Sequence, residues 1–225
     1  MTHSRPGRRV SVDQFGTVLL LLAATIAVSF LSESGPALRA VMVLLGGLTV
    51  IVTVLAAGAP RFAVRGAMVV VAIAGIIAVV GFTIGSLDER GFIPVLGVAF
   101  SLIAGAAVVW RLVLQPVVTI RTALGATCLF LLAGLFFAYS YLVIDALAGP
   151  VFVQLDAAQP ADAVYFSFVT LATLGYGDLT PLPDFARMLA TFEAIGGQLY
   201  LVLIIAVIVA NLGRVRQPRR GGDQD

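Results

Sequence analysis

Long apolar stretches with at most one charged side chain most constrain what this chain can fold into. Six such stretches are 19 to 26 residues long, and only the last contains a charge, Glu193. They lie at residues 14–32, 40–60, 66–87, 91–110, 122–144 and 188–213. Because a helix needs about 20 apolar residues to cross the hydrocarbon core of a bilayer, the sequence predicts an all-α membrane protein with six transmembrane helices.

Composition excludes several other classes of protein. Of the 225 residues, 60% are hydrophobic and 12% are charged, which is too apolar for a water-soluble enzyme or a disordered chain. The net charge of +2 gives no reason to expect nucleic acid as a partner. The only histidine, His3, lies in the N-terminal tail, and Cys128 has an apolar setting suited to packing. With no nucleophile–base pair or metal-ligand cluster, we expect neither an enzyme nor a bound cofactor.

The arginines predict the orientation in the cell (inner) membrane. With both termini cytoplasmic, 11 of the 14 arginines lie inside, and only Arg39, Arg90 and Arg187 lie outside, as the positive-inside rule requires. The C-terminal tail ends in an arginine cluster that we interpret as a topology anchor with some attraction for anionic lipid. This cluster consists of Arg214, Arg216, Arg219 and Arg220.

The connection between the fifth and sixth stretches has an unusual composition. After a loop with Gly149, Pro150 and Pro160, an apolar and aromatic run covers residues 163–172, too short to span a bilayer. Asp162 is expected to cap a short helix that starts there. Irregular backbone at membrane depth is tolerated only where protein or water covers it. The pattern therefore predicts a re-entrant pore helix followed by an irregular strand.

Residues 170–178 read Thr-Leu-Ala-Thr-Leu-Gly-Tyr-Gly-Asp. This segment resembles the selectivity-filter motif of the potassium-channel family, with Leu174 where valine is commonest. The resemblance covers roughly residues 120–213, as outer helix, pore helix, filter and inner helix. It is closest to the bacterial type with six transmembrane helices and one pore loop. Since one chain supplies one filter strand, it implies a homotetramer around a fourfold pore.

The chemistry of such a filter follows from its backbone. Stacked rings of carbonyl oxygen can replace the hydration shell of a cation if successive residues alternate in handedness. Gly175 and Gly177 allow the positive φ values that this alternation requires. We expect K⁺ to be coordinated by carbonyls of Thr173, Leu174, Gly175 and Tyr176. The Thr173 hydroxyl would add an oxygen at the inner end, and Tyr176 would pack outward.

Other residues are predicted to support the filter. The resemblance places Tyr165, in place of the family's usual tryptophan, where its hydroxyl can donate to Asp178, whereas the neighbouring Phe166 cannot hydrogen-bond. Glu193 is expected to hydrogen-bond the pore helix or a threonine such as Thr170, and the alternative is a gating proton switch.

The sixth stretch also contains candidates for a gate. Gly197 aligns with the hinge glycine of the family's inner helix, although close helix packing explains a small residue equally well. Below it, Leu201, Ile205 and Val209 are candidates to face the pore and close it by dewetting.

The first four stretches lack the features of a voltage sensor. Residues 91–110 contain no arginine, and Arg90 and Arg111 only flank them. We therefore expect a cytoplasmic tail at 1–13, a peripheral four-helix domain at 14–115 that does not sense voltage, a pore domain at 116–213 and a basic cytoplasmic tail at 214–225.

Together these features predict a potassium-selective channel that conducts K⁺ passively and is not voltage-gated. The alternatives are a non-selective cation channel, a potassium transporter or its membrane subunit, and a non-conducting subunit.

Overall fold

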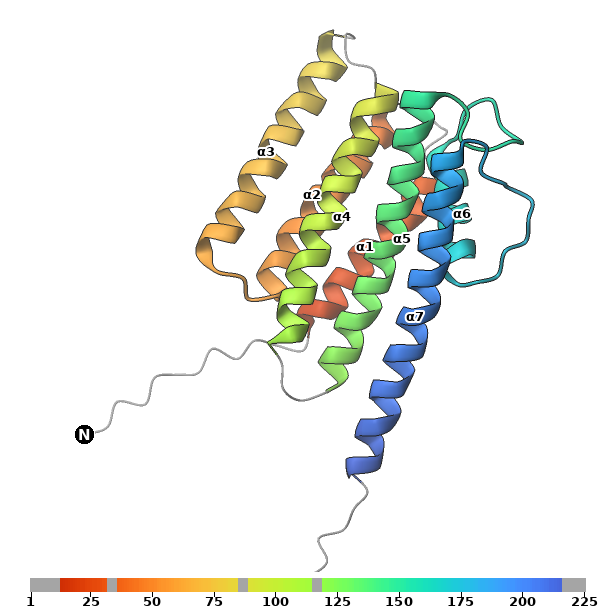
Figure 1. The fold of residues 1–225 in the computed structure, drawn as a ribbon. Helices are drawn as coiled ribbons and strands as arrows, with labels where there is room; N and C mark the ends of the chain where they lie inside the picture. The colour runs from red at the N-terminus through yellow and green to blue at the C-terminus, as the bar shows by residue number, and fades with distance from the viewer. Residues whose placement is uncertain (1–12, 32–35, 85–88, 115–118, 216–225) are drawn as a thin grey trace, which may run out of the picture.

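The computed structural model describes residues 13–31, 36–84, 89–114 and 119–215, which form seven helices (Figure 1). The helices are α1 Asp13–Leu31, α2 Pro36–Ala56, α3 Arg61–Ile84, α4 Glu89–Val113, α5 Ile120–Ala148, α6 Pro160–Leu171 and α7 Asp184–Val215. In this part of the chain, β pairing is limited to one isolated bridge, between Phe152 and Pro181. The predicted all-α class is therefore confirmed.

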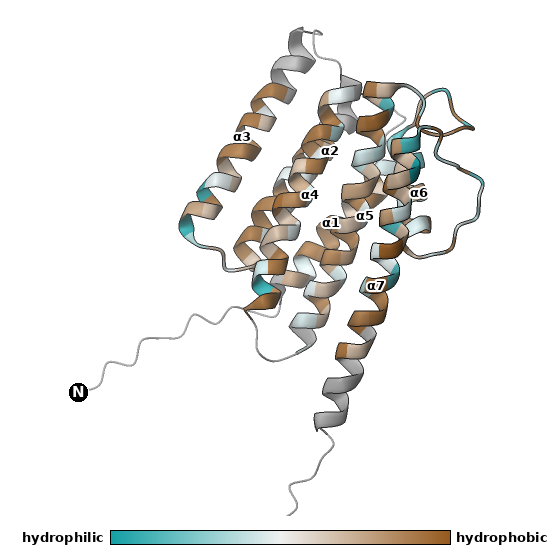
Figure 2. Cartoon of the chain, viewed as in Figure 1, coloured by the Kyte–Doolittle hydropathy of each residue, from teal (hydrophilic) through white to brown (hydrophobic). Residues whose placement is uncertain are grey.

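The helices form a bundle in which α5 occupies the centre. α4, α1, α6 and α7 all pack against α5, and α1 also contacts α6. α3 lies at the opposite edge of the molecule from α7, in contact mainly with α2 (Figure 1). The helices are predominantly hydrophobic along their length, and hydrophilic residues gather at their ends and in the loops near α6 (Figure 2).

The described helices agree with a membrane protein, but they do not establish how many of them cross the membrane. Three of them are long and apolar enough to cross a bilayer, at Gly91–Val113, Thr122–Ala148 and Asp184–Ile204. Phe15–Leu31 and Ala40–Ala56 are shorter apolar helices within the described residues. The total of six spans stays a prediction.

Helices α4 and α5 approach each other closely because α4 has a glycine, Gly97, at their contact. A Cβ atom added at Gly97 would lie 2.4 Å from the ring of Tyr139, closer than any real side-chain contact. The Tyr139 side chain is buried at this contact. The aromatic ring therefore lies directly against the backbone of α4, which joins the first four helices to the second half of the chain.

Helix α6 starts earlier than the sequence predicted. Its first residue is Pro160, Gln159 precedes it as the N-cap, and Asp162 lies in the first turn. The Asp162 carboxylate accepts a hydrogen bond of 2.9 Å from the backbone N–H of Gln159. The assignment of Asp162 as the cap was wrong, because it reaches back to the cap from the third helical position.

Several predictions lie outside the described residues. They concern the tail at 1–12, the residues from 216 onward and the side chain of Arg214.

Candidate functional site

The segment after α6 has a backbone that alternates in handedness. Thr173 has a φ of 59°, Gly175 of 57° and Gly177 of 78°, whereas Leu174 and Tyr176 do not have positive φ. Positive φ is easy for glycine but costs a residue with a Cβ roughly 1–2 kcal/mol. Thr173 is the described part's one non-glycine residue with positive φ. The sequence predicted positive φ at Gly175 and Gly177 but not at Thr173.

Hydrogen bonds tie the start of this strand to the end of the pore helix. The N–H of Thr173 donates to the carbonyl of Thr170 over 2.9 Å, and the N–H groups of Leu174 and Gly175 donate to the carbonyl of Val169 over 2.9 and 3.4 Å. Among the described residues, no backbone hydrogen bond is made to a carbonyl oxygen of residues 173–176. The amides are thus held by the protein while the carbonyls remain available as ligands.

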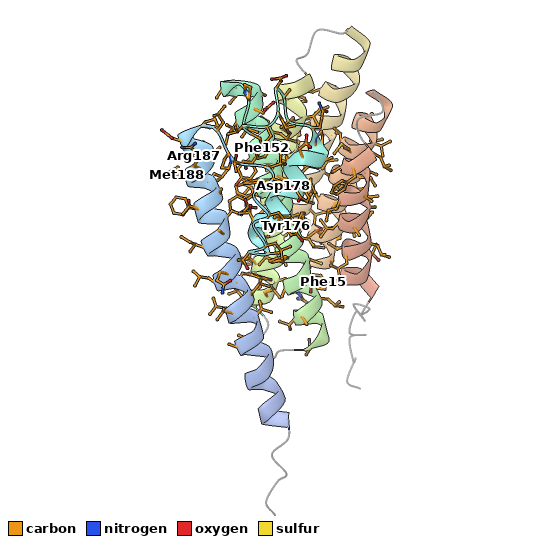
Figure 3. All side chains as sticks on the ribbon, turned by 90° about the vertical axis from the view of Figure 1, so that its right-hand side faces the viewer. Phe15, Phe152, Tyr176, Asp178, Arg187 and Met188 are labelled. Carbon is orange, nitrogen blue, oxygen red and sulfur yellow. The ribbon has the colours of Figure 1, made fainter. Side chains whose placement is uncertain are left out.

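The strand lies on the surface of the single chain. All residues from 173 to 178 are exposed, with Leu174 at 57% and Tyr176 at 66%. Figure 3 places Tyr176 and Asp178 on this strand beside α7, which is itself largely uncovered. A row of free carbonyls on an apolar surface is incomplete by itself, because in a membrane those dipoles need a cation, water or protein beside them.

Tyr165 and Asp178 form the hydrogen bond that the resemblance implied. The Tyr165 hydroxyl donates to Asp178 Oδ2 over 2.6 Å, and the Tyr165 ring stacks on that of Tyr176 with centroids 6.5 Å apart. The hydrogen bond from Tyr165 lowers the pKa of Asp178, and the same bond raises the pKa of Tyr165 to about 12. The strand is therefore braced against α6 at its outer end.

Phe166 supports the pore helix by packing instead of hydrogen bonding. Its ring lies 5.0 Å from that of Tyr141 and 4.9 Å from that of Phe152, and all three side chains are buried. Since these residues come from α6, α5 and the loop between them, the cluster fixes α6 against α5.

The loop before α6 also holds the segment that follows the filter. Gln154 Oε1 accepts from the N–H of Thr180, and Gln154 Nε2 donates to the Thr180 hydroxyl, both over 3.0 Å. The N–H of Val153 donates to the Thr180 carbonyl over 2.9 Å. Asp145 Oδ1 orders the loop by accepting from the N–H groups of Val151 and Ala158. No sequence pattern predicted this pairing, because it depends on contacts between distant residues.

Glu193 is completely buried and contacts two helices. Its Oε2 accepts from the Tyr141 hydroxyl of α5 over 2.7 Å, and its Oε1 lies 2.5 Å from Ser167 Oγ of α6. The expected contact with the pore helix is present, but the suggestion of Thr170 was wrong. Ser167 occupies the buried face of α6, and the side chain of Thr170 has no hydrogen bond to Glu193.

Gly197 lies against the end of the pore helix. A Cβ atom added there would be 2.3 Å from the carbonyl oxygen of Leu171, and α7 runs through this position as one continuous helix. Close packing against Leu171 therefore explains why residue 197 is a glycine. A hinge at Gly197 stays a prediction. Leu201 is partly buried, while the side chains of Ile205 and Val209 lie outside the described residues.

Comparison with known proteins agrees with this geometry. Residues 125–214, which include α6, the strand and most of α5 and α7, match the ion-channel family. The predicted resemblance to the potassium-channel family is confirmed for this part of the chain. A curated relative is the inward rectifier potassium channel Kirbac3.1 of Paramagnetospirillum magnetotacticum, 36% identical over 88 residues. The match covers 39% of this chain and 28% of the relative. No solved structure matches the chain.

Proposed function

We propose that the chain is a potassium-selective channel that conducts K⁺ passively across the cell membrane. The observation that carries the proposal is the alternating backbone of residues 173–177, in which the N–H groups of residues 173–175 bond to carbonyls of the pore helix. The carbonyls of Thr173, Leu174, Gly175 and Tyr176 would replace the hydration shell of K⁺. Potassium is the permeant ion in this proposal, and no other cofactor is needed.

A homotetramer would complete the site. Four strands around one axis are needed to surround a cation with rings of oxygen, and each chain has one such strand. The exposed strand supports this assembly, because its carbonyls need a cation, water or protein beside them at membrane depth. The apolar face of α7 is exposed in the single chain and is therefore free to contact a second copy. Exposed side chains on α7 include Phe192, Ile195, Leu199, Val202 and Leu203.

The first four helices would act as a fixed collar around the pore domain. In this proposal residues 14–115 form the collar and residues 116–213 form the pore. The interior of α4 carries no charge between Arg90 and Arg111, and α4 packs closely on α5 at Gly97. Neither feature suits a helix that moves through the membrane field, so the channel would not be voltage-gated.

The membrane orientation in this proposal follows the arginines. Both termini would be cytoplasmic, and the arginine cluster at residues 214–220 would lie at the inner surface, where anionic lipid attracts basic residues.

Planar-bilayer recordings under a potassium/sodium gradient test the proposal. Wild-type protein is expected to reverse near the potassium equilibrium potential. Gly175→Ala is expected to lose selective current, because a Cβ is disfavoured at a φ of 57°. Gly196→Ala is the control, since a Cβ there would meet nothing within 4 Å.

Each alternative function has its own outcome in this experiment. A reversal potential between the two equilibrium values would indicate a non-selective cation channel. Absence of current would favour a non-conducting subunit, and potassium flux too slow to resolve as channel openings would favour a transporter.

A further inference from the structure

Three helices meet around the buried carboxyl group of Glu193. Tyr141 approaches it from α5 and Ser167 approaches it from α6. Ser167 Oγ also lies 2.7 Å from the carbonyl oxygen of Gly134, one of the residues of α5. Glu193 and Ser167 are both fully buried, and so is Tyr141, so water cannot supply hydrogen atoms to these contacts.

The hydrogen atoms available to this cluster can be counted. A serine hydroxyl has one hydrogen to donate, and a backbone carbonyl can only accept. Ser167 Oγ is within hydrogen-bond distance of two acceptors, Gly134 O at 2.7 Å and Glu193 Oε1 at 2.5 Å. If Glu193 were ionised, one of these two close contacts between oxygen atoms would contain no hydrogen.

A proton on Glu193 satisfies every contact in the cluster. The Tyr141 hydroxyl then donates to Glu193 Oε2, the protonated Oε1 donates to Ser167 Oγ, and the Ser167 hydroxyl donates to the carbonyl of Gly134. Each donor has one acceptor in this arrangement, and each heavy-atom distance lies between 2.5 and 2.7 Å.

The charges around Glu193 favour the same state. The polar groups that face it are the Tyr141 phenol from α5 and the Ser167 hydroxyl from α6. On α7 itself, Arg187 is exposed and bonds to the carbonyl of Pro181 and to Asp184. Within the described residues no cation pairs with Glu193, and an unpaired buried carboxylate is strongly disfavoured.

We propose that Glu193 is a neutral carboxylic acid whose proton joins the inner helix to the pore helix. The chain of bonds from Tyr141 through Glu193 and Ser167 to Gly134 then acts as a latch between α5, α6 and α7. This inference rests on the proposed channel function for its effect on conduction, although the protonation state itself does not. Glu193 is a positioning residue here, because it acts on the filter through α6. Removal of the proton at alkaline pH opens the latch.

Infrared spectroscopy of the purified protein tests the protonation state without any current. The wild-type minus Glu193→Gln difference spectrum at neutral pH should contain the carbonyl band of one protonated carboxyl group. A carboxylate band in its place would overturn the inference. Because this readout does not depend on ion flow, it holds even if the proposed channel function fails.

Substitutions test the latch. Glu193→Gln should conduct like the wild type, because its amide N–H₂ donates to Ser167 and its carbonyl accepts from Tyr141. Ser167→Ala leaves the protonated Glu193 carboxyl without an acceptor and removes the bond to the Gly134 carbonyl. It should lower potassium current about tenfold, which corresponds to about 1.4 kcal/mol. Ser140→Ala is the matched control, because the Ser140 hydroxyl bonds only within α5, to the carbonyl of Phe136.

A pH series combines the two readouts. Wild-type current should decline over the same alkaline range in which the protonated band disappears, and Glu193→Gln should keep its current there. A Glu193→Gln variant as impaired as Ser167→Ala would overturn the latch, and so would loss of the wild-type band with unchanged current.

Discussion

One phenolic hydroxyl braces the outer end of the proposed filter. Tyr165→Phe removes only the oxygen that donates to Asp178 over 2.6 Å. We expect this variant to lose current faster during sustained opening, because the strand is then free to leave its conducting shape. The measurement is the rate of current decay at constant voltage.

Tyr200→Phe is the control for that substitution. It removes a tyrosine hydroxyl that bonds to the carbonyl of Ala126, away from the filter. Its current should decay at the wild-type rate. Equal decay rates in the wild type and Tyr165→Phe would contradict the role of the brace.

The site residues differ in how far the sequence could predict them. Gly175, Gly177 and the bond from Tyr165 to Asp178 were predictable, because a local motif and its spacing determine them. The positive φ of Thr173 was not, since it opposes the preference of a β-branched residue and is imposed by the bonds to Val169 and Thr170. Ser167 was missed because its partners, Gly134 and Glu193, are distant in sequence.

Two adjacent glycines on α7 allow a test of how elements pack. Gly197→Ala would place a Cβ 2.3 Å from the Leu171 carbonyl and so displace the pore helix that the filter follows, whereas Gly196→Ala meets nothing within 4 Å. Overpacking of this kind costs about 1–3 kcal/mol. We expect Gly197→Ala to lower both thermal stability and potassium current, and Gly196→Ala to change neither.

A hinge at Gly197 makes a different prediction from close packing. If bending is the reason for the glycine, Gly197→Ala should lower the open probability while the melting temperature stays unchanged. Thermal unfolding of the detergent-solubilised protein distinguishes the two explanations.

The helices themselves were largely predictable from charge. Charged residues are costly inside a bilayer, so the uncharged stretches gave the position of every long helix to within a few residues. Helix α6 was located correctly, but its start was not, because Gln159 is an uncommon cap and its bond to Asp162 involves the folded loop. The hydrogen bonds between Gln154 and Thr180 could not be predicted from any local sequence pattern.

At the scale of the whole molecule, the largest contact between the peripheral helices and the pore domain is that of α4 with α5, and α1 adds contacts with α5 and α6. Gly97→Ala would bring a Cβ to 2.4 Å from the Tyr139 ring, whereas Gly105→Ala on the same helix makes an ordinary contact of 3.9 Å with Leu129. We expect Gly97→Ala to loosen the collar and raise hydrogen exchange in α4, with Gly105→Ala close to wild type. Identical exchange in the two variants would contradict a tight collar.

The absence of charge inside α4 predicts weak voltage dependence. Steep gating needs roughly three to four elementary charges per subunit, each worth about 2.3 kcal/mol per 100 mV. Residues 91–110 supply none. Any residual voltage dependence should come from ions in the filter, and so should shift with external potassium. A steep conductance–voltage curve that ignores external potassium, or a gating current of several charges per channel, would contradict this account.

The central claim is that four copies of residues 173–176 together bind potassium. The most direct measurement is a cryo-electron microscopy structure of the purified protein in potassium, compared with one in sodium. The account predicts a fourfold assembly with ion density on its axis, level with the carbonyls of Thr173, Leu174, Gly175 and Tyr176, and a change in that density when sodium replaces potassium. An assembly whose axis does not pass between these strands, or a filter without ion density in potassium, would contradict it.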